Sequence, residues 1–230
     1  MVEAALRALG QMDDRAFRSA LWASILWTLL AFVGLAILAF LALDHWLAFW
    51  GAGWLGAALA VLATGFAAWL LFVPLAAGIA TLYTERVAAA VEARWYPALP
   101  PGRPASLAAQ AWDGFAVFLR LALAQLLLAV LLHTGFVLFL PWAGVLWLGL
   151  SGWAYARGLF VALAMRRLSR GAALATWRAR RIPAIGVGIL VALASLVPVV
   201  NLAAPLLGIA ALVHVLERPV RDRVGWRQMA

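Results

Sequence analysis

Four long runs without a charged residue constrain the fold more than any other feature of the chain. Residues 19–43, 46–84, 121–156 and 182–216 contain no Asp, Glu, Lys or Arg, and they are 25, 39, 36 and 35 residues long. One membrane-spanning helix needs about 20 apolar residues, so the last three runs are long enough to fold back. Since 67% of the chain is hydrophobic and 12% is charged, the runs predict an all-α integral membrane protein.

The breaks between the runs predict a bundle of about four spanning helices in one polytopic membrane domain, residues 1–230. Asp13 or Asp14 can cap the first helix, because a short carboxylate accepts hydrogen bonds from the free amides of a first turn. The second helix passes through Pro74, and residues 141–144 form a turn between the third and fourth. The four helices are expected over about residues 15–43, 54–95, 106–140 and 145–168.

The last run is interrupted near its middle by Pro198, Asn201 and Pro205. Arginines flank both of its ends, so both ends are expected on the same side of the membrane. Each arm holds about 16 residues, or about 24 Å of helix, which is shorter than the roughly 30 Å hydrocarbon core. A C-terminal re-entrant, hemi-penetrating helical hairpin is therefore favoured over two full spans. Pro198 is expected to end the first arm, Asn201 to cap the second, and Pro205 to lie in its first turn.

The basic residues are distributed on one side of this scheme. All 18 are arginines, and the turns around residues 44–53 and 141–144 contain none of them. Because cytoplasmic loops are enriched in basic residues, both termini are expected in the cytoplasm. The net charge of +9 is thus explained by membrane topology and does not indicate a nucleic-acid partner.

No enzyme signature is visible, and the sequence indicates neither a cofactor nor a metal site. The chain has no cysteine, and its three histidines, His45, His133 and His214, have no carboxylate at ligand spacing. Glu85 and Glu92 lie seven residues apart, on one face of a helix. We expect them to form the solvated face of an amphipathic helix near arginines, and coupling to proton movement is the alternative.

Four residues are candidates for binding an anion: Arg15, Arg18, Arg157 and Asn201. Arg15 and Arg18 lie at the start of the first helix, where guanidinium groups and helix amides together can hold a tetrahedral oxyanion. Their alternative role is to fix the topology beside anionic lipid headgroups. Arg157 lies about two turns inside the end of the fourth helix, where it either extends to the membrane surface or faces a cavity.

Four stretches carry a family resemblance that extends over nearly the whole chain. They read "DDRAFRSAL", "FVPLAAGIATLYTERVAAAVEARWYPALPP", "ARGLFVALAMRRLSR" and "LVPVVNLAAPLLGIAALVHV". In the placement of proline, asparagine and arginine, the chain resembles the CysZ sulfate-permease family, which shares its domain with the etoposide-induced membrane proteins. The resemblance implies spanning helices with hemi-penetrating hairpins, a homo-oligomer in the membrane, and admission of sulfate.

The chain departs from the family's motifs at three places. Ser19 follows Arg18 where sulfate permeases of the family carry a second arginine, and "AAGIATL" lacks the glutamate of their Gly-Leu-x-Ala-Glu motif. Gly158 and Leu159 stand where related chains carry Glu and Tyr in Gly-Arg-Glu-Tyr-Phe. These departures leave the fold inference in place and make sulfate a hypothesis by analogy.

The leading hypothesis is a bacterial inner-membrane anion permease or channel-like protein for sulfate uptake, not an enzyme. Its partners would be an inorganic oxyanion such as sulfate, membrane lipid and further copies of the chain. The alternative is a non-transporting membrane scaffold or assembly factor of the same fold, because the family's glutamate and second arginine are missing here.

Overall fold

All the regular secondary structure is helical in the part of the chain that the structure describes. This computed structural model describes residues 2–49, 51, 53–133 and 140–228. Its elements are α1 (Val2–Gly10), η1 (Gln11–Asp13), α2 (Arg15–Phe49), α3 (Gly53–Ala80), η2 (Thr81–Tyr83), α4 (Thr84–Trp95), α5 (Leu107–His133), α6 (Leu140–Met165), α7 (Arg170–Ala194) and α8 (Pro198–Gln228). The predicted all-α class is confirmed.

Five stretches of the described residues are long and apolar enough to cross a membrane. They are Arg15–Phe49, Leu70–Trp95, Leu107–Val130, Gly144–Met165 and Val200–Glu217. Large apolar side chains are exposed along most of them, such as Trp22 at 68% and Leu146 at 65% of their accessible area. An exposed apolar surface of this extent identifies a multi-pass membrane protein.

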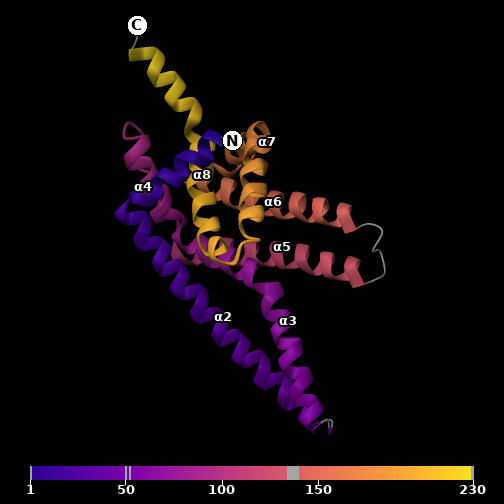
Figure 1. Ribbon diagram of the computed structural model, residues 1–230. Coiled ribbons are helices and arrows are strands. Elements are labelled where there is room, and N and C mark those ends of the chain that lie inside the picture. Colours follow the sequence, from indigo (N-terminus) through magenta and orange to yellow (C-terminus); the bar gives the residue numbers. More distant parts are fainter. Residues whose placement is uncertain (1, 50, 52, 134–139, 229–230) are drawn as a thin grey trace.

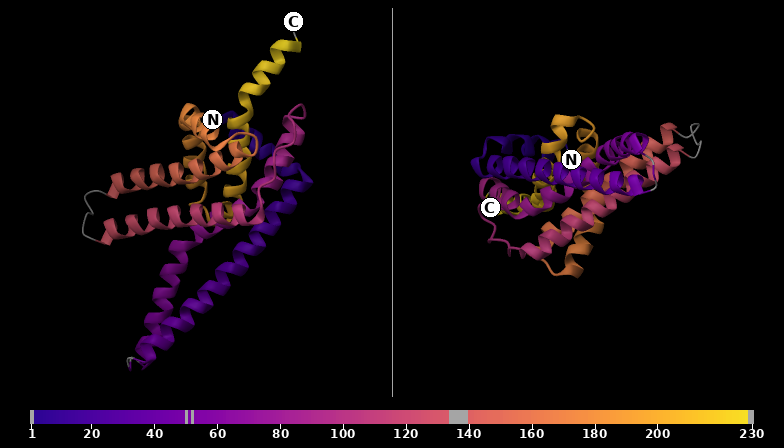
Figure 2. Two further views of the ribbon diagram at one scale, coloured as in Figure 1. Left: turned by 180° about the vertical axis from the view of Figure 1, so that it is seen from behind. Right: turned by 90° about the horizontal axis from the view of Figure 1, so that it is seen from below.

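The long apolar helices form two hairpins that extend in different directions. In Figure 1, α2 and α3 run side by side toward one end of the molecule, while α5 and α6 run side by side toward another. Figure 2 shows the same divergence from behind. The helices α1, α4, α7 and α8 gather where the two hairpins meet. This junction brings the chain's polar segments together.

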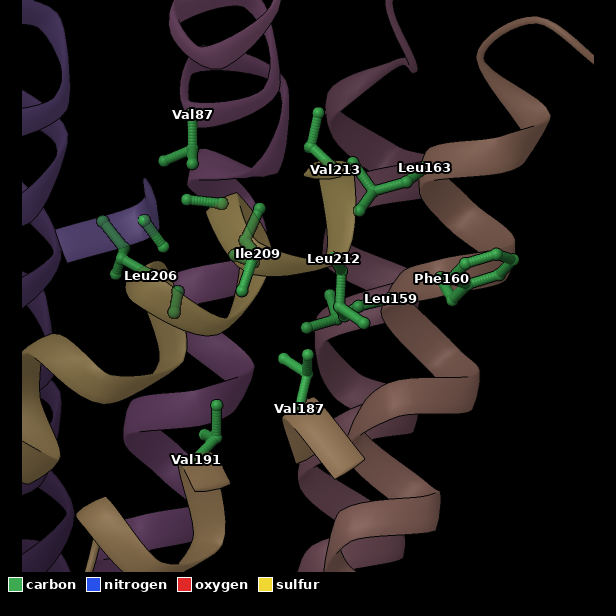
Figure 3. Packing of buried hydrophobic residues seen from close by; sticks show 14 of the residues in the cluster. Val87, Leu159, Phe160, Leu163, Val187, Val191, Leu206, Ile209, Leu212 and Val213 are labelled. Atoms are coloured by element: carbon green, nitrogen blue, oxygen red, sulfur yellow. The ribbon is translucent and has the colours of Figure 1, made fainter. Parts of the chain in front are cut away.

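The apolar core of the protein lies at this junction and is centred on α8. Leu206, Ile209 and Leu212 of α8 are fully buried, and Figure 3 shows them among side chains from α4, α6 and α7. In the most apolar stretch of α8, 72% of the residues are buried within the protein, against 6% for α2. Protein therefore surrounds this stretch of α8, whereas α2 exposes its apolar side chains around most of its circumference.

Glycines allow α6 and α7 to pack with their backbones in contact. A Cβ atom added at Gly188 of α7 would lie 2.1 Å from the carbonyl oxygen of Gly152 on α6. One added at Gly152 would lie 2.8 Å from the backbone nitrogen of Ile189. Small residues at such positions are a common means of helix association in membranes, because they bring two backbones close together.

Several expected boundaries are corrected. Residues 2–10 form α1, which was not expected, and the first long helix continues to Phe49 instead of ending near residue 43. The second expected helix does pass Pro74, but the 3-10 turn η2 divides it. The turn predicted at residues 141–144 is wrong, because α6 begins at Leu140. Proline is tolerated in a first helical turn, where its missing N–H leaves no bond unmade.

The C-terminal segment forms a helical hairpin, as expected, with longer arms. The arginine-rich residues that precede the last apolar run belong to α7, which is capped by Ser169, and the tail of the chain extends α8. As a result α7 has 25 residues and α8 has 31. The hairpin is thus observed, whereas its re-entrant placement in a membrane remains a prediction.

The three residues that define the hairpin are shifted toward the interior of α8 relative to the positions expected for them. The first arm ends at Ala194, and Pro198 opens α8 instead of ending the first arm. Asn201 is not a cap: it lies inside the first turn, and its backbone N–H donates to the carbonyl oxygen of Val197 at 2.8 Å. Pro205 consequently lies in the second turn. Pro198 accounts for the shift, because its fixed φ suits the first helical position.

Candidate anion site

The start of α2 carries the two arginines that were expected to bind an anion. Asp14 caps the helix: its Oδ1 accepts the backbone N–H of Ala16 at 2.7 Å and that of Phe17 at 3.0 Å. Both Arg15 and Arg18 are exposed. Because the protein's own carboxylate occupies these two amides, an anion at this position would depend on the guanidinium groups.

A larger concentration of positive charge lies between α5 and α6. An open pocket of about 520 Å³ is formed by these two helices, the start of α7 and the segment before α5. Trp112 and Asp113 of α5 also line it. Its basic lining residues are Arg103, Arg120, Arg157, Arg166 and Arg170. We call it the arginine pocket, and five guanidinium groups against one carboxylate give it a strongly positive lining.

Arg157, the candidate from the fourth predicted helix, faces this pocket. Its Cζ atom lies 5.5 Å from the ring centroid of Trp153, one helical turn earlier on α6. Within the described residues, Arg157 has no carboxylate at ion-pair distance, and the same is true of Arg103, Arg120 and Arg170. Unpaired, exposed guanidinium groups that converge on a pocket are available to a soluble oxyanion.

Gly158, the residue after Arg157, has no side chain and so leaves space for the guanidinium group of Arg120 from α5. A Cβ atom at Gly158 would lie 3.1 Å from Nη1 of Arg120 and 3.0 Å from Cγ2 of Val117. The position is one of those at which the chain departs from the family's motif. Without a glutamate there, the pocket keeps its positive charge, and the guanidinium of Arg120 lies against α6.

Behind the pocket lies a buried group of ion pairs that we call the ion-pair cluster. It consists of Glu85 and Glu92 on α4, Arg166 and Arg167 after α6, and Glu217 on α8. The Nε of Arg166 donates to Glu85 at 2.9 Å, and its Nη1 donates to Glu92. Arg167 bonds to Glu92 at 2.9 and 3.0 Å and to Glu217 at 3.0 Å. The cluster ties α4 and α8 to the end of α6.

The cluster corrects the expectation for Glu85 and Glu92. The two residues do share one face of a helix, but the prediction that this face is solvated is wrong, because Glu92 is only 8% exposed. A carboxylate can be buried when guanidinium groups neutralise it and donate hydrogen bonds to it. Arg166 and Arg167, which directly follow α6, supply the guanidinium groups that neutralise Glu92 and donate hydrogen bonds to it.

The hairpin turn borders a small cavity through Ser195, which is buried, whereas Leu196 and Val197 of the turn are exposed. Ser195 and Pro205 line a space of about 20 Å³ together with Trp147 and Ser151 of α6. The hydroxyl of Tyr155 donates to the carbonyl oxygen of Pro205. This volume is close to that of a single bound water molecule. Irregular backbone at membrane depth is tolerated when it is buried in protein or lines a cavity, and within the turn Ser195 is the residue that is buried and lines the cavity.

The four predicted site residues do not converge on one site. Arg157 lines the arginine pocket, but Arg15, Arg18 and Asn201 are not among the residues that line it. Asn201 is 2% exposed, and its side-chain oxygen has no hydrogen-bond partner within the described residues. Sequence reasoning missed the other arginines of the pocket.

A signal for one of them was present in the sequence. Arg120 directly precedes the charge-free run of residues 121–156, and Arg157 directly follows it. If that run folds into an antiparallel hairpin, the two arginines flanking it must face each other across the open end. The two ends of the run, taken together, would therefore have predicted that Arg120 lies in the same site as Arg157.

Comparison with known proteins agrees with this architecture. Residues 4–205 match the family described as "Sulfate transporter CysZ/Etoposide-induced protein 2.4", which covers most of the chain. No curated protein matches the sequence. The match includes both apolar hairpins, the ion-pair cluster except Glu217, and all the lining of the arginine pocket. The chain therefore belongs to the sulfate transporter CysZ/etoposide-induced protein 2.4 family.

Proposed function

We propose that the protein is an anion permease or channel-like protein of the bacterial inner membrane that admits sulfate or a similar oxyanion. The observation that carries the proposal is the arginine pocket, in which four exposed guanidinium groups have no carboxylate at ion-pair distance within the described residues. Its volume of about 520 Å³ lies within the usual range for small-ligand sites. Membership in a family described as sulfate transporters supports the same conclusion.

The guanidinium group suits this task for a geometric reason. Its planar fork can donate two parallel hydrogen bonds to two oxygens of a tetrahedral anion. Arg120 and Arg157 approach from different helices, so an anion between them would receive such bonds from two directions. We assign the primary contacts to these two residues.

Arg15, Arg18 and Asn201 remain part of the proposal as separate contacts. Arg15 and Arg18 would attract anions to the end of α2, since exposed positive charge raises the local anion concentration. Asn201 would offer its buried amide at the hairpin. Further parts of the proposal are cytoplasmic termini, surrounding lipid and a homo-oligomeric state.

Sulfate flux into proteoliposomes tests the function. The wild-type protein is expected to take up labelled sulfate faster than empty vesicles. Arg157→Gln is expected to lower the initial rate by about tenfold, since the loss of charge-assisted hydrogen bonds costs at least about 1.5 kcal/mol. Arg18→Ala is expected to lower it as well.

A matched control uses Arg178, which is exposed on α7 and does not line the arginine pocket. Arg178→Gln removes the same charge and should leave the flux near the wild-type rate. Wild-type flux no greater than that of empty vesicles would contradict the proposal. Equal losses in the Arg157 and Arg178 variants would contradict the assignment of the pocket.

The second candidate function is a non-transporting membrane scaffold or assembly factor. The observation that favours it is Asp14, which occupies the helix amides that an anion would otherwise use at α2. This alternative predicts no flux for any variant, including those with an intact arginine pocket.

A further inference from the structure

Arg166 belongs to both the arginine pocket and the ion-pair cluster. It follows the last residue of α6, and only 6% of its surface is exposed. It lines the arginine pocket on one side and, on the other, a second pocket of about 500 Å³ between α4 and the segment that follows α4. Glu85 and Glu92 line that second pocket but not the first. Arg166 thus stands between the positive pocket and its own carboxylate partners.

The guanidinium group of Arg166 is fixed from three directions. Nε donates to Glu85 Oε2 at 2.9 Å, and Nη1 donates to Glu92 Oε1. A Cβ atom at Gly102 would lie 2.9 Å from its Cζ, so the backbone of Gly102 packs directly on the group. The carbonyl oxygen of Arg166 also accepts the N–H of Arg103, a pocket residue, at 2.8 Å. A displacement of Arg166 would therefore change both the arginine pocket and the contacts with Glu85 and Glu92 on α4.

The two partners of Arg166 are not equivalent. Glu92 is bonded to both Arg166 and Arg167, so it keeps a cationic partner if Arg166 moves. Glu85 has Arg166 as its ion-pair partner and otherwise accepts the N–H of Ala105 at 3.2 Å. Of the two carboxylates it is also the more exposed, at 19% of its side chain against 11%. The bond to Glu85 is the weaker restraint on Arg166.

Because of these contacts, we propose that Arg166 sets the affinity of the arginine pocket, and that a bound oxyanion competes with Glu85 for its guanidinium group. The proposal rests on the oxyanion-binding function proposed above. Glu85 lowers anion affinity by holding Arg166, and an anion in the pocket weakens the contact of Arg166 with α4. The two effects are linked, because coupling between two binding events is reciprocal.

Sulfate binding to purified Glu85→Gln protein tests the proposal. The amide cannot hold Arg166 by charge, so the affinity for labelled sulfate is expected to rise on the order of fivefold. The control is Glu217→Gln, which removes the same charge from the same cluster. Glu217 pairs with Arg167 and not with Arg166, so its variant is expected to stay near the wild-type affinity. Equal affinity changes in the two variants would overturn the proposal, because they would reflect net charge alone.

A second variant and a second readout separate positioning from a purely structural role. Glu85→Asp keeps the charge on a shorter side chain and should also raise the affinity, even if Glu85→Gln folds poorly. In the wild type, sulfate should increase amide hydrogen exchange in α4, and this increase should be absent in Glu85→Gln. If the wild type binds sulfate, but the Glu85 variants show no rise in affinity and α4 shows no increase in exchange, the inference is overturned and the proposed function stands. Absence of sulfate binding in the wild type overturns both.

Discussion

At the scale of single residues, Gly158 determines what lies beside the guanidinium group of Arg120 in the arginine pocket. The guanidinium of Arg120 lies so close to α6 that a Cβ atom at Gly158 would touch it at 3.1 Å. Any side chain at residue 158 would begin with a Cβ atom in contact with the guanidinium group of Arg120. A carboxylate at residue 158 would neutralise Arg120 directly, so the absence of a side chain here preserves the charge of Arg120 in the proposed anion site.

This argument predicts a charge-specific effect at residue 158. Gly158→Glu should lower sulfate affinity by about tenfold or more, since the new carboxylate takes over hydrogen bonds worth about 1.5–3 kcal/mol. Gly158→Gln has nearly the same size and no charge, so it should lose less affinity. Equilibrium binding of labelled sulfate to both variants measures the difference. Equal losses would show that size at residue 158, and not charge, controls binding.

At the scale of helices, the close contact between α6 and α7 fixes the junction at which the two apolar hairpins meet. Their backbones touch at Gly152 and Gly188, where a Cβ atom would overlap the neighbouring backbone. A backbone atom cannot move aside as the end of a flexible side chain can. The two helices would have to separate to admit even one methyl group.

Gly188→Ala is therefore expected to destabilise the protein by about 1–3 kcal/mol, the usual cost of overpacking. Gly149→Ala on α6 is the control, because a Cβ atom there has no neighbour within 4 Å. Alanine favours helix more than glycine does, so the control should be neutral or slightly stabilising. Thermal unfolding in one detergent compares the two. Similar melting temperatures would argue that α6 and α7 do not pack as closely as described.

The helices also show which structural features could be predicted from the sequence. Charge-free runs predicted the α2–α3 and α5–α6 hairpins, because lipid requires long apolar segments with satisfied backbone. The ends of the helices were predicted less well. Proline at residues 141 and 198 was interpreted as a break, although both positions lie in the first turn of a helix, where proline is well suited.

The ion pairs could not be predicted from the sequence pattern of a single helix, because they join residues that are far apart in the chain. Glu85 and Glu92 were expected to face solvent, because nothing in their own helix shows that Arg166 and Arg167 will pack against them. Those partners are more than seventy positions away in the chain. Arg157 was singled out as a residue that could face a cavity, but Arg103, Arg120 and Arg170, which line the same pocket, come from other segments.

At the scale of the whole molecule, the proposed function depends on how separate segments meet. The arginine pocket combines side chains from the segment before α5, from α5 and α6, and from the region around the start of α7. The ion-pair cluster then joins this region to α4 and α8. The diverging hairpins provide the exposed apolar surface, while the junction at which they meet holds the charged clusters, so the two features lie in different parts of the fold (Figure 1).

Binding of labelled sulfate to the purified protein tests the central claim, that the arginine pocket holds an oxyanion, most directly. Three proteins are compared at equal ionic strength: wild type, Arg120→Gln and Arg178→Gln. The account predicts saturable binding to wild type, an affinity about tenfold weaker for Arg120→Gln, and no change for Arg178→Gln. Saturable binding of equal affinity in all three proteins would contradict it, because the anion would then be held outside the arginine pocket.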